Sequence, residues 1–200
     1  LTIYRWYVAA GDFGLVDGYV STLFNVTSVV TTTGYASEDY STWGPLAFVL
    51  FFFLMFVGGC SGSTAGGMKI FRFQLSLIVL REQLMRLLHP RAVFTRNYNG
   101  RAVSDEIISS MIAYTFIFLL SLLIITIALA ALQLDFITSL SGALTVLTNV
   151  GPALGDTIGP AGTFAPLPEA AKWILSVGML MGRLEILSVV IVLSPAFWRS

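Results

Sequence analysis

Between Ile107 and Leu134 the chain runs for 28 residues without a charged side chain. A bilayer core about 30 Å thick takes about 20 apolar helical residues to cross, so this run is long enough to span a membrane. The whole chain is 56% hydrophobic and 11% charged, whereas an ordinary soluble domain is about 25% charged. A soluble fold of this composition would have too little polar surface to cover its core. The sequence therefore predicts an integral membrane protein.

The uneven distribution of charge predicts the orientation of the chain. Seven of the eleven Lys and Arg residues lie between Lys69 and Arg101, and most acidic residues lie outside that stretch. By the positive-inside rule, residues 69–104 are expected to be cytoplasmic, and turns such as the one at Asp135 are expected to face outward. Juxtamembrane arginines commonly orient helices, so the expected partner of this segment is the lipid membrane and not nucleic acid.

A short apolar segment followed by a polar turn ending in glycine occurs twice in the chain. The apolar segments cover residues 18–30 and 136–147 and are too short to cross a bilayer. An offset of 117 pairs Gly34 with Gly151 at the two turns. A polar outer loop is expected after the first turn, at residues 37–43. Farther along the chain, equivalent residues of the two copies are 120 positions apart and no longer 117.

Both copies start outside and end inside, so they form a parallel repeat. Such a repeat, turning about an axis normal to the membrane, encloses a central pore, whereas an inverted repeat would favour a rocking transporter. The predicted fold is all-α and potassium-channel-like, with tandem M1–pore helix–M2 units, in which two membrane helices flank a re-entrant pore helix and a filter loop.

The two turns have the residue types of an ion filter. A dehydrated potassium ion needs a ring of backbone carbonyl oxygens, for which TVGYG is the reference sequence. Glycine allows the positive φ that such a backbone requires. Candidate K⁺ positions are Thr32, Thr33, Asn149 and Val150, and side-chain oxygens of Thr32 and Asn149 are expected to contribute. The full predicted ion-binding set is Thr32, Thr33, Gly34, Tyr35, Asn149, Val150, Gly151 and Pro152. A polar loop between two ordinary helices is the alternative for each turn alone.

Half of the ten residues from Gly58 to Gly67 are glycine, and each glycine inside a helix costs about 1 kcal/mol relative to alanine. This glycine tract follows the apolar run after Pro45, so it lies at membrane depth. Irregular backbone at that depth is tolerated only where it is buried in protein or lines a watery cavity. We therefore expect the tract to line the pathway.

Together these segments resemble the C-terminal half of a TrkH/KtrB-type potassium uptake protein, in particular the TrkH branch. The resemblance is carried by residues 31–35, 58–69, 89–90, 103–106, 149–152, 182–185, 195 and 197–199. It implies a third pore repeat at 1–88, with a truncated M1, pore helix 18–30, filter 31–35 and a broken M2 at 45–88. A cytoplasmic connector at 89–104 follows. The implied fourth repeat covers 105–200, with M1 105–134, pore helix 136–147, filter 148–152 and M2 169–198.

The same resemblance implies potassium transport, a multi-pass location in the bacterial inner membrane, no cofactor and no enzyme activity. The glycine tract would be an intramembrane gate below the filter, with Arg183 beside it. The implied gate residues are Gly58, Gly59, Ser61, Gly62, Ser63, Gly66, Gly67 and Arg183. Implied partners are two N-terminal repeats of the same polypeptide, a second copy in a homodimer, and a TrkA-like cytoplasmic nucleotide-binding regulatory subunit contacting residues 81–101.

Three other functions remain open. A slow alternating-access cation carrier could use the turns as an occluded site, and the chain could also be a structural membrane subunit. Residues 59–62 fit the GxSG pattern of rhomboid proteases, but that chemistry needs a histidine base close to the serine. His89, the only histidine, is expected beyond the cytoplasmic end of the same helix.

Overall fold

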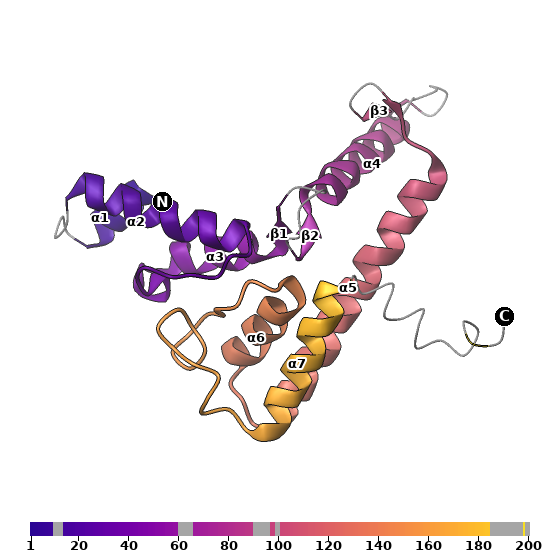
Figure 1. Ribbon diagram of the computed structural model, residues 1–200. Helices are drawn as coiled ribbons and strands as arrows, with labels where there is room; N and C mark the ends of the chain where they lie inside the picture. The colour runs from indigo at the N-terminus through magenta and orange to yellow at the C-terminus, as the bar shows by residue number, and fades with distance from the viewer. Residues whose placement is uncertain (10–13, 60–65, 90–96, 99–100, 185–197, 199–200) are drawn as a thin grey trace.

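The computed structural model describes residues 1–9, 14–59, 66–89, 97–98, 101–184 and 198 (Figure 1). Its helices are α1 (Thr2–Val8), α2 (Leu15–Val30), the 3₁₀ helix η1 (Tyr40–Thr42), α3 (Pro45–Phe56), α4 (Ile70–Leu88), α5 (Asp105–Ala131), α6 (Phe136–Thr148) and α7 (Glu169–Arg183). Its short strands are β1 (Val57–Gly58), β2 (Met68–Lys69), β3 (Asn97–Tyr98) and β4 (Arg101–Ala102).

Local sequence signals explain several helix ends. Pro45 occupies the first turn of α3, where its missing N–H has no intrahelical partner to lose. Asp135 caps α6 by accepting a hydrogen bond from the Thr138 backbone N–H at 2.9 Å. Helix α5 ends at Ala131, shortly before Gln133, which has a φ of 64°. This left-handed residue stops the helix three residues short of the expected 105–134.

The other expected ranges differ from the structure by a few residues. Helix α2 begins three residues before the expected pore helix 18–30, and α6 continues one residue beyond 136–147. Helix α7 ends at Arg183, and of the rest of the expected range 169–198 only Leu184 and Trp198 are among the described residues. Strands β3 and β4 pair antiparallel.

Helix α6 is the centre of the packed region. It contacts α3, α5 and α7, and from Thr138 to Thr148 only Leu140 is not classed as buried. Figure 1 shows α6 and α7 beside the carboxyl-terminal half of α5, α1–α3 on the other side, and α4 beside the amino-terminal half of α5, where Arg72 lies over the Tyr114 ring at 3.7 Å. A short helix enclosed by its neighbours is the arrangement expected of a re-entrant segment, because its backbone ends must be covered by protein.

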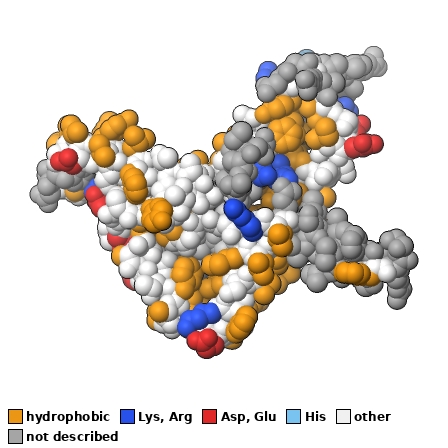
Figure 2. Space-filling model, in the orientation of Figure 1, with side chains coloured by type: hydrophobic (Ala, Val, Ile, Leu, Met, Phe, Trp, Pro, Cys, Tyr) orange, Lys and Arg blue, Asp and Glu red, His pale blue; other side chains and the backbone are white. Residues whose placement is uncertain are grey.

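The outer face of α5 is apolar and uncovered. Ile112, Phe116, Leu123 and Ile127 are each more than half exposed, and Figure 2 shows hydrophobic side chains on several exposed surfaces of the molecule. Among the described helices, α5 is the one long and apolar enough to cross a membrane. Lipid is the environment in which such a surface is stable.

The segment expected as a polar outer loop at 37–43 contains buried aromatic residues. Tyr40 and Trp43 pack on Phe51 of α3, with the Tyr40 and Phe51 rings stacked at 4.0 Å between centroids. Burial, together with the neighbouring Asp39, raises the pKa of Tyr40 above its ordinary value. Tyr40 and Trp43 therefore pack the loop onto α3, whereas Ser37, Glu38 and Thr42 are exposed.

Candidate functional site

The two predicted filter turns have the same backbone conformation. Thr32 and Asn149, which correspond at the offset of 117, are both left-handed, with φ of 55° and 56°. The glycines two positions later, Gly34 and Gly151, have φ of 81° and 112°. Non-glycine residues seldom adopt positive φ, so its recurrence at equivalent positions shows that the sequence repeat is also a structural repeat.

Each turn is anchored to the end of its own helix by matching hydrogen bonds. The Thr33 N–H donates to the Ser28 carbonyl at 2.9 Å, and the Val150 N–H donates to the Thr145 carbonyl at 3.1 Å. These two bonds are also related by the offset of 117. These two backbone N–H groups point back toward their own helices. They therefore do not point toward the side of each turn that faces away from its helix.

The two turns approach each other at Gly34. A Cβ atom placed on Gly34 would overlap the carbonyl oxygen of Val150 and lie 3.3 Å from Pro152 Cδ. From the other side, a Cβ on Gly151 would lie 3.9 Å from the Cα of Gly34. Both the positive φ and the lack of space therefore require glycine at position 34. The structure brings the two predicted filter segments together.

The side chains of the second turn tie it to its surroundings. The amide nitrogen of Asn149 donates to the Met179 carbonyl of α7 at 3.3 Å. The Thr145 hydroxyl accepts from the Gly151 N–H at 3.1 Å and donates to the Pro152 carbonyl at 2.9 Å. In the first turn the hydroxyls of Thr31 and Thr33 are 2.8 Å apart. Asn149, expected to contribute a side-chain oxygen to the ion, thus also tethers the turn to α7.

The described end of the glycine tract at Gly66 and Gly67 lies against the end of α6, next to the second turn. A Cβ on Gly66 would overlap the Thr148 carbonyl oxygen, and Gly67, with φ of 77°, lies against the Thr148 side chain. The tract closes on itself through parallel pairing of β1 with β2 and through a close contact between Gly58 and the Gly66 carbonyl. Of the predicted gate residues, Ser61, Gly62 and Ser63 lie outside the described residues.

Arg183, the last residue of α7, is exposed in this structure. Its neighbour Gly182 packs so closely on α6 that a Cβ there would overlap the Leu147 carbonyl oxygen and come 2.5 Å from the Asn149 amide nitrogen. Arg183 therefore follows directly on the contact between α7 and the base of the second turn. Its sequence neighbour Glu185 lies outside the described residues.

A polar face on each short helix was not predicted as functional. Thr22, Asn25 and Ser28 on α2 are buried, as are Ser141 and Thr145 on α6. Asn25 and Ser141 receive the backbone N–H groups of Ser37 and Leu154, which lie three residues after the two filter glycines. The sequence could have indicated this role, because polar side chains on a short apolar helix need hydrogen-bond partners once they are buried.

A helical frame in which two short helices, the enclosed α6 and the half-exposed α2, end in matching glycine turns is the arrangement of a membrane transport protein. The chain belongs to the TrkH family, whose model, described as a cation transport protein, matches residues 10–200. This family consists of transporters and not of enzymes. Membership confirms the predicted all-α membrane fold with tandem repeats.

Named relatives are bacterial potassium uptake proteins. The chain is 56% identical over 199 residues to the Trk system potassium uptake protein TrkI of Halomonas elongata, covering 100% of this chain and 40% of that protein. It is 32% identical to TrkG of Escherichia coli, covering 98% and 39%. The crystal structure of the potassium transporter TrkH from Vibrio parahaemolyticus matches with a TM-score of 0.88 and 34% identity, covering 97% and 41%. The chain thus spans about 40% of the length of these relatives.

Proposed function

We propose that the protein containing this chain transports K⁺ across a bacterial inner membrane through a channel-like pore, and that the chain contributes two of its filter segments. The observation that carries the proposal is the approach of the Val150 carbonyl to Gly34. Two pore-helix turns that meet at their glycines can line one axis, and backbone carbonyls on that axis can replace water around a monovalent cation. The names of the relatives specify potassium as the ion.

In this proposal K⁺ is held at Thr32, Thr33, Asn149 and Val150, and the filter continues through the residues that follow them. The carboxyl ends of α2 and α6 point toward the turns, so the helix dipoles contribute partial negative charge where the cation would sit. The remaining oxygens would come from further repeats, since two segments surround only part of an ion.

The gate in this proposal is the glycine tract. Its described end at Gly66 is packed against Thr148, next to the second turn. A movement of the tract would therefore change the inner side of the proposed pathway. Arg183 would add a positive charge that opposes cation passage at the same level. Regulation would come from a TrkA-like nucleotide-binding subunit on the cytoplasmic face formed by residues 69–104, and two full-length copies would form a homodimer.

The test is electrical recording from the full-length protein in planar bilayers under opposing K⁺ and Na⁺ gradients. Gly34→Ala should lower the K⁺/Na⁺ permeability ratio, because a Cβ would meet the Val150 carbonyl and the residue would need positive φ. Gly14→Ala is the control, since Gly14 lies before the opposite end of α2 with no positive φ. An unchanged ratio in Gly34→Ala contradicts the filter. Ion flux without resolvable unitary currents would favour the carrier alternative.

A further inference from the structure

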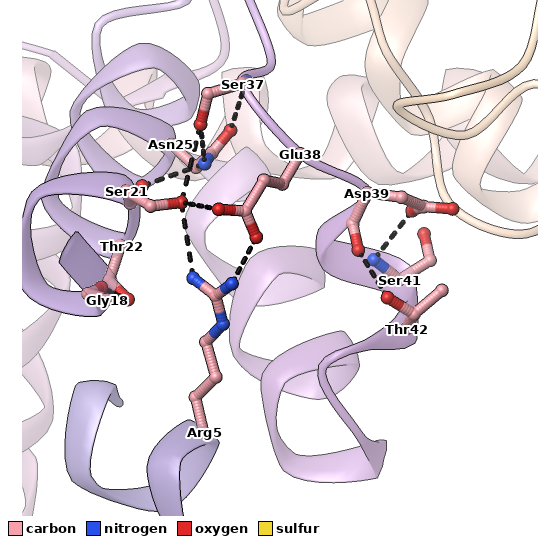
Figure 3. Close-up of polar contacts among 10 residues, drawn as sticks. All are labelled: Arg5, Gly18, Ser21, Thr22, Asn25, Ser37, Glu38, Asp39, Ser41 and Thr42. Carbon is pink, nitrogen blue, oxygen red and sulfur yellow. Dashed lines mark hydrogen bonds and ion pairs between the residues drawn. The ribbon is translucent and has the colours of Figure 1, made fainter. Parts of the chain in front are cut away.

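A polar network joins α1, the outer half of α2 and the segment after the first filter turn (Figure 3). Arg5 donates through Nη1 to the Ser21 hydroxyl at 3.2 Å and through Nη2 to the Glu38 carboxylate, with which it forms an ion pair. The Ser21 hydroxyl in turn donates to Glu38 Oε1 at 2.7 Å. Each of the three side chains therefore contacts the other two.

Asn25 extends this network to the residue before Glu38. Its Oδ1 accepts the Ser37 backbone N–H at 3.1 Å, and its Nδ2 donates to the Ser37 hydroxyl at 2.8 Å and to the Ser21 carbonyl at 2.8 Å. Asn25 is 0% exposed. The backbone three residues after Gly34 is thus fixed to the buried face of the pore helix, and the next residue carries the carboxylate that Arg5 binds.

The ion pair is partly desolvated and has a rigid support. The Arg5 side chain is 12% exposed and that of Glu38 is 41% exposed. The guanidinium lies 4.1 Å from the centre of the Trp43 ring, and Trp43 packs on Phe51 of α3. Cation–π stacking and a fixed aromatic base restrict the arginine to one position. Removing one partner of such a pair leaves the other charge poorly compensated.

Among the described residues, the second turn is supported by uncharged side chains. The offset of 117 places Leu154 and Gly155 where the first repeat has Ser37 and Glu38. The Leu154 N–H donates to the Ser141 hydroxyl at 3.2 Å, and that hydroxyl lies 2.7 Å from the Ile137 carbonyl one turn earlier in α6. The two repeats therefore fix the same part of the backbone by different chemistry.

We propose that Arg5 and Glu38 are positioning residues for ion selectivity: their pair fixes the outer exit of the first filter turn from behind. This inference rests on the proposed potassium filter. Neither side chain needs to touch the ion, because Glu38 acts through Ser37 and the backbone leading to Gly34. A turn released at this end would relax around the smaller Na⁺, so selectivity would fall more than the rate of transport.

The experiment measures the K⁺/Na⁺ permeability ratio and the maximal ⁸⁶Rb⁺ uptake rate of the full-length protein. Arg5→Met and Glu38→Gln should each lower the ratio roughly fivefold, an effect at the upper end of the range for exposed ion pairs. The double variant should be no worse than the more severe single variant, because both remove one interaction. The charge exchange Arg5→Glu with Glu38→Arg should recover part of the ratio.

Two controls separate positioning from a change in surface charge. Asp39→Asn removes the neighbouring negative charge but keeps the acceptor for the Ser41 N–H, which is 3.0 Å away. Lys172→Met breaks an ion pair with Glu169, at 2.8 Å, in the first turn of α7. Both should retain the wild-type ratio. If Asp39→Asn lowers the ratio as much as Glu38→Gln does, the effect is electrostatic and the proposal is overturned.

Gly34→Ala separates a failure of the positioning role from a failure of the proposed filter. If it lowers the ratio while Arg5→Met and Glu38→Gln do not, the filter stands and the positioning role is wrong. If Gly34→Ala also has no effect, the proposed function itself has failed. Should Arg5→Met not assemble, the near-isosteric Glu38→Gln decides the result, and a wild-type ratio in that variant overturns the proposal.

Discussion

Thr32 and Asn149 show how closely the two turns agree at single residues. The left-handed region costs an L-residue roughly 1–2 kcal/mol, although asparagine tolerates it better than most. Such conformations persist where the surroundings over-determine them. Here the determinants are the hydrogen bonds from Thr33 and Val150 back to their own helices, which close each turn immediately after the left-handed residue.

The substitution Asn149→Asp should loosen the second turn. Aspartate keeps some tolerance for positive φ but replaces the amide donor to Met179 with a carboxylate oxygen facing a carbonyl. We expect a lower melting temperature in detergent, equivalent to about 1–3 kcal/mol for an unsatisfied partner, and a lower K⁺/Na⁺ ratio. Asn149→Gly is the matched variant, because it loses the donor but relieves the backbone. A melting temperature for Asn149→Asp at or above that of Asn149→Gly would contradict this account.

Among the elements, α6 depends on its amino-terminal cap. Hydrogen bonds from the Thr138 side chain and backbone N–H hold the pKa of Asp135 below its ordinary value. A lowered folded-state pKa gives stability that is complete above the unfolded pKa of about 3.9 and is lost as the pH falls through the folded value. The charge of Asp135 therefore stabilises the protein at neutral pH and not in strong acid.

Asp135→Ala should accordingly destabilise the protein by about 1 kcal/mol at pH 7, a typical value for a lost cap. The difference from wild type should shrink as the pH falls below about 3.9. Thermal unfolding in detergent across this range measures it. Asp135→Asn, which retains a capping acceptor without the titrating charge, should lose less stability than alanine at pH 7. A pH-independent difference for alanine would exclude the carboxylate as its cause.

The contact between the glycine tract and the end of α6 gives a test of gating by the tract. Gly66→Ala would place a Cβ against the Thr148 carbonyl oxygen and so displace the end of the tract from α6. If the tract is a gate held by this packing, basal K⁺ conductance should rise in bilayer recordings. The Gly14→Ala control should behave as wild type. A Gly66→Ala protein that assembles normally with unchanged open probability would count against gating by the tract.

The sequence predicted the short helices and their glycine turns because helix length and positive φ are local properties. The glycine pair 34 and 151 was placed correctly by one offset, and the structure repeats its backbone at both. Partners that depend on tertiary packing were not predictable in this way. The Asn149 amide donates a hydrogen bond to Met179 of α7, thirty residues farther along the chain. Arg5 forms its ion pair with Glu38 only because α1 packs against α2. Burial of Tyr40 was missed for the same reason.

For the whole molecule, the proposal implies that transport needs more than these two segments. The chain covers about 40% of each relative, and the proposed ion is coordinated from one side only. Liposomes containing this segment alone should therefore show no selective ⁸⁶Rb⁺ uptake, and co-expression with the remaining part of the full-length polypeptide should restore it. Selective ⁸⁶Rb⁺ uptake by the segment as a monomer would contradict the proposal that this chain supplies only part of the pore.

Helix α5 has a consequence for the host lipid. Its uncharged part, the 25 residues from Ile107 to Ala131, extends about 37 Å at 1.5 Å per residue, whereas the hydrocarbon core is about 30 Å thick. Hydrophobic mismatch of this sign is relieved by tilting the helix or by thickening the bilayer around it. Helix α6 packs directly on α5. A change in lipid acyl-chain length that tilts α5 would therefore displace α6 and the proposed filter turn at its end, and ion permeation should depend on bilayer thickness.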